Sequence, residues 1–406
     1  MSDAATARAP SAAALYLALV QFLFVTCWTL YVIFLPGLLE TAGLSRRYVP
    51  WILILDQLTF MVMDVVTGVA ADRAGRMLGR IGPLIIGLTT ISCIAFLLIP
   101  HAAGWGEFST AALLTLILVW TATSSALRAP PWVLLSRHAA APSVPRMNAL
   151  MLTGLAVGGA LAPYLGITLK NLDPRLPFAA SSLTLLATTV GLIWVERALS
   201  RQRAGPAPPP AASARLTAGS WVFAAGCLLL ALGFQLHFSL NSAEQYLRVT
   251  VPERLPYLMP MFWIGSNLAM FPGAALARRY GTLPVIAAAA LIGAAATLAS
   301  VLVRDLDSLL AAQFTAGGAW GCILMASFSA ALEYGRTGRE GLALGLLFAA
   351  LAGAALARIA AVAAEINKVP GLVSDLEWAP FVLWLAGAVL FAALASTSAR
   401  RAAPVP

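Results

Sequence analysis

Long apolar runs separated by short polar segments constrain the fold of this chain more than any other feature. A transmembrane helix needs about 20 consecutive apolar residues. Twelve runs reach that length, at residues 15–39, 49–71, 81–100, 109–136, 147–169, 176–196, 219–247, 255–277, 282–303, 308–334, 341–364 and 377–397. Only 11% of the residues are charged, whereas about a quarter of a soluble domain is charged. The sequence therefore predicts an all-α membrane protein with twelve transmembrane helices.

The longest polar interruption divides the twelve runs into two sets of six. Residues 197–218 contain the sequence AGPAPPPAAS and four arginines, and a proline-rich composition of this kind is typical of a semi-rigid linker. We therefore expect an N-terminal tail at 1–14, a six-helix bundle at 15–196, the linker at 197–218, a second six-helix bundle at 219–397 and a C-terminal tail at 398–406.

The distribution of basic residues predicts the orientation of this multi-pass protein. With the N-terminus inside, 16 of the 26 Lys and Arg residues fall in inside segments and 8 in outside segments. Cytoplasmic loops carry such an excess, so we expect both termini and the linker in the cytoplasm. The net charge of +9 does not indicate nucleic-acid binding, because the arginines lie in short loops between apolar runs. Tryptophans at span ends are expected to anchor helices at the membrane surface, and these are Trp51, Trp132, Trp221 and Trp378.

A charged stretch that contains glycine, GVAADRAGR, runs from Gly68 to Arg76 between the second and third apolar runs. We expect it to form a short cytoplasmic hairpin. Gly68 would let a neighbouring helix approach closely, and Gly75 would allow a tight reversal. Asp72 can accept hydrogen bonds from the N-terminus of a nearby helix or pair with an arginine. Arg73 and Arg76 would hold the loop on the cytoplasmic side.

The spacing G-x-x-x-D-R-x-G-R resembles the signature between spans 2 and 3 of the major facilitator superfamily, a family of twelve-helix secondary transporters. The resemblance implies two pseudo-symmetric six-helix bundles and a gating role for Gly68, Asp72, Arg73, Gly75 and Arg76. The second half carries a weak echo, GAALARRYG after the eighth run, in which Arg278 stands in the position of Asp72. Internal similarity between two parallel halves is a feature of such transporters.

More of the first half resembles bacterial efflux-type members of that family. Arg128 is followed by Pro130 and Pro131 in the fourth run, and the fifth run begins with Asn148-Ala149-Leu150. A set of small residues and a proline in the fifth run partly resembles the glycine–proline motif of the antiporter branch: Gly154, Gly158, Gly159, Pro163 and Gly166. The match is partial because a glycine, Gly159, stands where the motif has its proline. Small residues in membrane helices also serve simply as close-packing surfaces.

Three carboxylates within the spans are candidates for proton coupling: Asp56, Glu244 and Asp64. A carboxylate in an apolar site favours its protonated form and can load and release a proton near neutral pH. The alternative is a fixed salt bridge with Arg128 or Arg358. For Asp64, which is close to the charged stretch, we favour the structural role, and for the other two the roles stay open. His237, Asn241, Glu244 and Arg248 follow one another at helical spacing and are expected on one face of the seventh span.

The resemblance also implies that spans 1, 4, 7 and 10 line a central cavity. Candidate cavity residues are the polar, charged and aromatic side chains of these spans together with an arginine of span 11: Gln21, Trp28, Tyr31, Trp120, Ser124, Arg128, His237, Asn241, Gln313, Trp320 and Arg358. The three tryptophans are equally consistent with packing and with stacking on an aromatic substrate. His237 is expected to form hydrogen bonds rather than bind a metal, because no second His or Cys shares its face.

Several chemistries lack the residues they need. The four cysteines lie in apolar runs without paired spacing, so we expect packing roles and no metal site. The sequence has no nucleotide-binding P-loop and no cluster of nucleophile and base. We therefore expect neither an enzyme with catalytic residues nor a cofactor, and we expect the proton gradient to supply the driving ion.

The sequence and the resemblance together predict a bacterial inner-membrane secondary transporter that works by alternating access. The first hypothesis is proton-coupled export of a small organic, including amphipathic, molecule. The alternative is a proton-linked importer or a uniporter of a metabolite such as a sugar or an organic acid, whose carboxylate Arg128 and Arg358 could hold. A rival of another class is a non-transporting membrane sensor or assembly factor on the same fold. The expected partners are a small-molecule substrate and the lipid bilayer, without nucleic acid, and the protein is expected to be a monomer.

Overall fold

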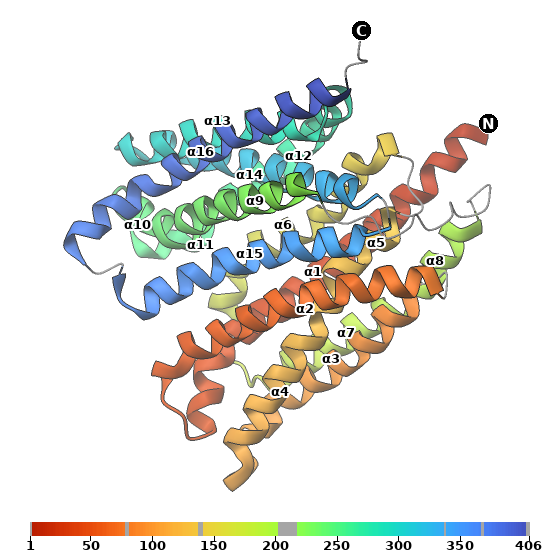
Figure 1. The fold of residues 1–406 in the computed structure, drawn as a ribbon. Helices are drawn as coiled ribbons and strands as arrows, with labels where there is room; N and C mark the ends of the chain where they lie inside the picture. Colours follow the sequence, from red (N-terminus) through yellow and green to blue (C-terminus); the bar gives the residue numbers. More distant parts are fainter. Residues whose placement is uncertain are drawn as a thin grey trace.

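The computed structural model describes residues 2–77, 81–136, 141–201, 217–336, 338–366 and 369–402. Within these ranges the regular structure is helical and contains no strand (Figure 1). The α-helices are α1 Ser2–Thr41, α2 Val49–Met77, α3 Gly82–Ala102, α4 Ser109–Ser124, α5 Ala129–Ser136, α6 Val144–Leu169, α7 Arg175–Val190, α8 Leu192–Arg201, α9 Ala218–Leu236, α10 Ser242–Leu247, α11 Leu255–Leu258, α12 Pro260–Tyr280, α13 Thr282–Leu302, α14 Leu306–Gly335, α15 Glu340–Ala363 and α16 Pro370–Ala402.

The helices confirm the predicted all-α membrane fold. Among the described residues, 11 helical segments are long and apolar enough to cross a membrane. The twelfth predicted span, at residues 255–277, corresponds mainly to α12. The polar residues Ser266 and Asn267 of α12, together with Arg278 and Arg279 at its end, account for its lower hydropathy. It still has 21 residues and packs against α6 and α14.

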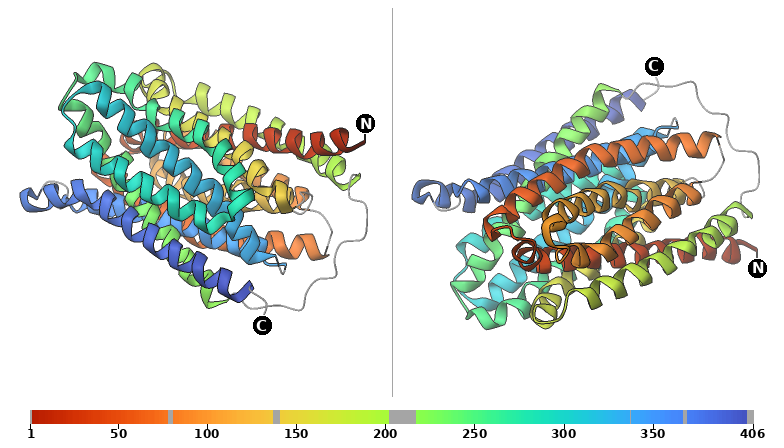
Figure 2. Two further views of the ribbon diagram at one scale, coloured as in Figure 1. Left: turned by 90° about the horizontal axis from the view of Figure 1, so that it is seen from above. Right: turned by 90° about the horizontal axis from the view of Figure 1, so that it is seen from below.

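Two pairs of helices join the N-terminal half, α1–α8, to the C-terminal half, α9–α16. The helix α2 packs along α15, and α6 packs along α12; Figure 1 shows α2 and α15 side by side. The start of α1 and the end of α16 lie at the same end of the molecule (Figures 1 and 2), and we call this the terminal end. The helix α8 continues to Arg201, five residues into the predicted linker 197–218, and α9 begins at Ala218. Residues 202–216 of the linker lie outside the described residues.

Glycines set the close approach of α2 and α15. A Cβ atom on Gly68 would lie 2.1 Å from the carbonyl oxygen of Gly341, and one on Gly345 would lie 2.5 Å from the carbonyl oxygen of Asp64. No larger residue fits such a distance without separating the two backbones. The predicted role of Gly68 in close helix approach therefore corresponds to a contact in the structure, and the contact crosses between the halves.

The predicted hairpin from Gly68 to Arg76 is wrong, because α2 continues to Met77. Gly75 is therefore helical and makes no reversal. The contacts of Gly68 and Asp72 with Gly341 at the start of α15 give the last turns of α2 the tertiary packing that maintains a helix. In the second half the corresponding glycine does turn the chain: Gly281 has φ +91° between α12 and α13.

Candidate functional site

A carboxylate from one half caps a helix of the other half at the terminal end. The backbone N–H of Gly341 donates to Asp72 Oδ1 at 2.8 Å, and that of Leu342 donates to Asp72 Oδ2 at 3.0 Å. These N–H groups belong to the first turn of α15, where they have no partner within the helix, and the positive end of the helix dipole favours a carboxylate. We call Asp72, Gly341 and Leu342 the terminal clasp. Arg73, the next residue, is exposed.

A buried aromatic layer lies beside the clasp. The indole of Trp132 in α5 stacks on Phe328 of α14 with ring centroids 4.6 Å apart and meets Phe348 of α15 edge-on at 5.5 Å. Trp132 is fully buried, so its predicted role as an anchor at the membrane surface is wrong. A hydrogen bond from Asn148 Nδ2 to Ser329 Oγ at 3.0 Å also joins the halves here. The terminal end is thus closed by polar and aromatic contacts.

Two prolines break the helix of the fourth span. Pro130 and Pro131 lack the N–H groups that would bond the carbonyls four residues earlier, and the chain forms a 3-10 turn at Ser125–Leu127 between α4 and α5. The side chain of Gln21 in α1 donates to the freed carbonyl of Leu127 at 2.6 Å. Gln21, a predicted cavity residue, is therefore buried and donates a hydrogen bond to a backbone carbonyl at the point where the helix is broken.

Arg128 follows this turn and pairs with Asp64. Its Nε lies 2.9 Å from Asp64 Oδ1; the carboxylate is fully buried and the arginine side chain is 16% exposed. The guanidinium lies between two aromatic rings, 4.6 Å from the centroid of Phe60 in α2 and 4.8 Å from that of Phe348 in α15. Arg128 therefore joins an ion pair within the N-terminal half to a cation–π contact across the halves.

Asp56 lies in a separate buried site. Tyr31 of α1 donates to Asp56 Oδ2 at 2.7 Å, and Thr121 of α4 donates to Oδ1 at 2.8 Å. Of the open alternatives, the salt bridge with Arg128 is formed by Asp64, whereas the hydrogen-bond partners of Asp56 are these two hydroxyl groups. Ser124 donates to the carbonyl of Thr121, so this predicted cavity residue is also held within its own half.

A π-helix at His237–Asn241 interrupts the seventh span between α9 and α10. His237 Nε2 contacts Gln313 Oε1 of α14 at 3.1 Å, whereas Asn241 Nδ2 donates to the carbonyl of Leu376 in α16 at 2.9 Å. The wider turn adds a residue to the helix, so the predicted common face is wrong. Glu244 is exposed at the surface of the protein, so the protein itself does not bury this carboxylate.

Gln313 is the centre of this buried network in the C-terminal half. Its Oε1 also accepts from Ser242 at 3.1 Å, and its Nε2 donates to Gln245 at 2.9 Å. Such a connected network fixes the side chains that it contains. His237 and Gln313, both predicted cavity residues, thus hold α9, α10 and α14 together. Among the described residues, no group of three His, Cys, Asp or Glu side chains is arranged to hold a metal.

Arg358 of α15 contacts a neutral partner. Its Nε donates to Gln235 Oε1 of α9 at 2.9 Å, and Ser239 donates to the same oxygen at 3.2 Å. The side chains of Arg358 and Gln235 are half-buried and Ser239 is exposed. Sequence reasoning selected Arg358 but missed Gln235, whose polarity within an apolar run was the available signal.

The three candidate tryptophans differ in their surroundings. Trp120 is buried and stacks on Trp28 with centroids 5.9 Å apart. Trp320 is buried, stacks on Phe234 with ring centroids 4.3 Å apart, and stacks on Trp384 with centroids 6.3 Å apart. Trp28 is half-buried. The structure therefore favours packing for Trp120 and Trp320.

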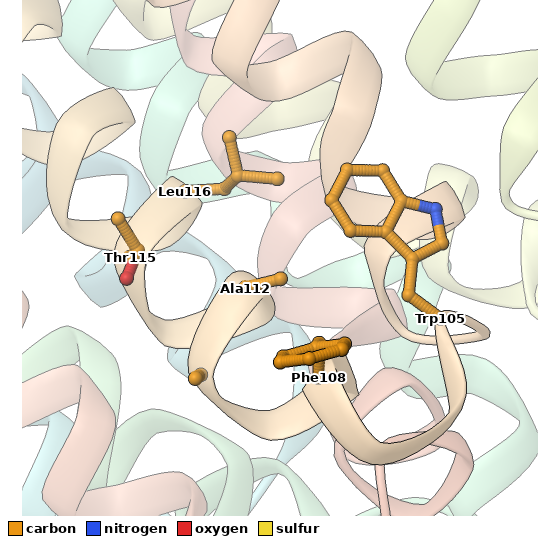
Figure 3. Close-up of a pocket in the computed structure, with 6 residues that line it drawn as sticks. Trp105, Phe108, Ala112, Thr115 and Leu116 are labelled. Carbon is orange, nitrogen blue, oxygen red and sulfur yellow. The ribbon is translucent and has the colours of Figure 1, made fainter.

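A surface hollow of about 660 Å³ lies at the end of the molecule opposite the termini. Its lining comes from the loop before α4 and from α4 itself, and Figure 3 shows Trp105 and Phe108 beside it. Among the described residues, those that line the hollow all belong to the N-terminal half. Since it involves one half only, we do not assign it to a path between the halves.

The N-terminal and C-terminal halves meet along α2–α15 and α6–α12, and a chain built from two such halves is typical of secondary transporters. The sequence profile of the Major Facilitator Superfamily matches residues 17–360. The chain therefore belongs to this superfamily. Members of the superfamily and the structural neighbours of the chain are transporters rather than enzymes. No curated protein matches the chain.

Solved structures show the same fold at low sequence identity. The E. coli transporter FucP in an outward conformation has a TM-score of 0.68 and 14% identity, covering 95% of this chain and 99% of its own. The human organic anion transporter MFSD10 has a TM-score of 0.69 and 16% identity over the same shares. A bacterial homologue of the iron transporter ferroportin, in an outward-facing state, has a TM-score of 0.70 and 13% identity, again over 95% and 99%.

Proposed function

We propose that this protein is a proton-coupled transporter that moves a small organic molecule across the bacterial inner membrane by alternating access. The terminal clasp is the observation that carries the proposal. A single carboxylate, Asp72, holds the start of α15 through two hydrogen bonds. Because both hydrogen bonds depend on one carboxylate, they can form and break together. A change of the protein between two conformations requires such contacts.

The excess of basic residues in the predicted inside segments supports a cytoplasmic terminal end. The clasp and the aromatic layer then close the cytoplasmic side, and this favours an outward-facing state. In this state Asp72 acts as the gate residue, with Gly68 providing the close approach of α2 to α15. Arg73, Gly75 and Arg76 belong to the same last turns of α2.

The salt bridge of Asp64 with Arg128 is the contact that the favoured structural role requires, and we propose that this same ion pair also serves as the coupling site. Protonation of Asp64 would remove the counter-charge of Arg128, and Arg128 also contacts Phe348 of α15. A proton at Asp64 would therefore alter a contact between the halves. Asp56 is the second candidate, but its donors Tyr31 and Thr121 both belong to the N-terminal half, so its protonation would act within that half.

Export is the direction that we favour, on the partial resemblance of the fifth span to the antiporter motif. Proton-linked import and uniport are the alternatives. The structural neighbours do not select a substrate, since their names include a fucose:proton symporter, an organic anion transporter and an iron transporter homologue. The substrate must therefore be inferred from the residues of this chain.

Reconstitution tests the proposal. Proteoliposomes that contain a trapped pH-sensitive dye receive a set of small organic solutes under an imposed pH gradient. We expect at least one solute to move protons only in the presence of the protein, and the direction of solute accumulation relative to the gradient distinguishes export from import. Solute movement that does not depend on the pH gradient would indicate a uniporter. Absence of movement for every solute would favour the non-transporting alternative.

A further inference from the structure

We propose that Arg358 binds an anionic group of the transported molecule, so that the substrate is an organic anion. The inference rests on the proposed transport function and assigns the substrate class. It starts from the charge balance within the spans. Asp64 neutralises Arg128, whereas among the described residues no carboxylate forms an ion pair with Arg358, which contacts the amide of Gln235.

An arginine within a membrane span is costly unless it is paired or functional. The guanidinium group has five N–H donors in a planar fork that matches a carboxylate or a phosphate group in a bidentate manner. Gln235 accepts from Nε, so it fixes the orientation of the group and leaves the terminal nitrogens as the edge for an anion. Ser239 donates to the same oxygen of Gln235, which holds the amide in the acceptor position.

The position of Arg358 suits a substrate that enters between the halves. Five residues before it, a Cβ atom on Gly353 would lie 3.6 Å from both Leu228 of α9 and Met61 of α2, so three helices from the two halves meet there. Arg358 lies further toward the end opposite the clasp. The neighbouring residue of Gln235, Phe234, begins an aromatic wall with Phe238 and Trp263. Because the wall is apolar and begins one residue from Gln235, we assign it to the organic part of the anion.

Thermal shift of the purified full-length protein in neutral detergent tests anion recognition, because a ligand that binds the folded state raises the unfolding temperature. The probes are benzoate, 2-naphthoate and phenyl phosphate, each compared with its neutral counterpart benzamide, 2-naphthamide or phenol. We expect at least one anion to stabilise the wild type and its neutral counterpart to have no effect. Equal shifts by the neutral probes, or no shift by any anion, would overturn the proposal.

Three variants locate the effect. Arg358→Gln should weaken the apparent affinity for the anion at least tenfold, and Arg358→Lys should weaken it less, since the charge remains but the fork is lost. Gln235→Glu should also abolish the shift, because it places a carboxylate beside an intact Arg358, and it guards against misfolding of the arginine variants. Arg304→Gln, which removes an exposed arginine, is the matched control and should bind as the wild type does. A wild-type response in both Arg358→Gln and Gln235→Glu contradicts the inference.

Two further arms separate the possible sources of failure. Phosphatidylglycerol and phosphatidylcholine are added in place of the soluble probes; an Arg358-dependent shift with phosphatidylglycerol alone would assign the site to a lipid headgroup and overturn a soluble substrate. Flux of the same probes is measured in proteoliposomes. Flux that persists in Arg358→Gln with wild-type affinity removes the anion site but keeps the transporter. An Arg358-dependent shift without any flux keeps the anion site and removes the transport function.

Discussion

Asp72 in α2 accepts the backbone N–H of Gly341 at 2.8 Å, although 269 residues separate them in the chain. The contact satisfies a donor that α15 leaves unpaired at its first turn. It also places a negative charge at the positive end of the helix dipole. Disruption of this one relationship should therefore affect the association of the two halves more than the stability of either half.

The variant Asp72→Asn should shift the population away from the state that is closed at the terminal end. A hydrogen bond to a charged group contributes about 1.5–3 kcal/mol, and each 1.4 kcal/mol changes an equilibrium about tenfold. The measurement is the rate at which a thiol reagent labels Ser329→Cys in a background without the four native cysteines. Ser329 is buried at the contact between the two halves. We expect faster labelling with Asp72→Asn, normal expression and slower turnover.

Glu107→Gln, which removes an exposed carboxylate at the opposite end, is the control and should label as slowly as the parent. If Asp72→Asn leaves both the labelling rate and the turnover unchanged, Asp72 is not a gate residue.

The variant Gly341→Ala should weaken the same contact between the two halves through a steric clash. Its Cβ atom would lie 2.0 Å from the carbonyl oxygen of Gly68, and overpacking of this kind costs about 1–3 kcal/mol. Gly353→Ala is the matched control on the same helix, because its Cβ atom would meet side chains at an ordinary 3.6 Å. Thermal unfolding and labelling of Ser329→Cys measure the effect. Equal behaviour of the two variants would contradict the close approach of α2 and α15.

The clasp shows which features the sequence can predict. The residue types of Gly68 and Asp72 indicated a close helix approach and a carboxylate that either accepts from a helix N-terminus or pairs with an arginine, and the structure shows the first of these two contacts. The partner helix could not be identified, since α15 begins far along the chain. The continuation of α2 through Gly75 was missed for a related reason: tertiary packing, absent from local sequence, maintains those last turns.

The interior of the halves was harder to predict. Gln21 and Gln313 are predicted cavity residues, but in the structure each bonds within its own half, Gln21 to a carbonyl freed by Pro131 and Gln313 to the side chain of His237. Both partners depend on irregular backbone, a 3-10 turn and a π-helix. An ideal helical period of 3.6 residues cannot foresee such changes of register. Apolar length, in contrast, predicted the spans well because the membrane imposes it.

Cysteine labelling in intact cells tests the orientation. Ser213→Cys lies in the predicted linker and should be protected from an impermeant reagent, whereas Asp173→Cys, in an exposed loop between α6 and α7, should react. The expectation follows from the excess of basic residues on the inside. Treatment of inverted vesicles is the control and should exchange the two results. Labelling of Ser213→Cys in intact cells, with Asp173→Cys silent, would reverse the topology.

Coupling is tested by removing one carboxylate at a time. Asp64→Asn should abolish accumulation of substrate against its gradient, because the neutral amide can neither bind nor release a proton, while exchange down the substrate gradient continues. Glu244→Gln should accumulate substrate normally, since Glu244 is exposed and lies outside the contacts between the halves.

Asp56→Asn distinguishes the two buried sites. If Asp64→Asn still concentrates substrate and Asp56→Asn does not, the proton acts through the site of Tyr31 and Thr121. If both variants still concentrate substrate, neither carboxylate couples transport to protons. The differential that coupling needs is modest, because a difference of one pKa unit between two states corresponds to about 1.4 kcal/mol. Rearrangement of the Arg128 contact with Phe348 can supply energy of this size, since a desolvated cation–π contact contributes about 2 kcal/mol.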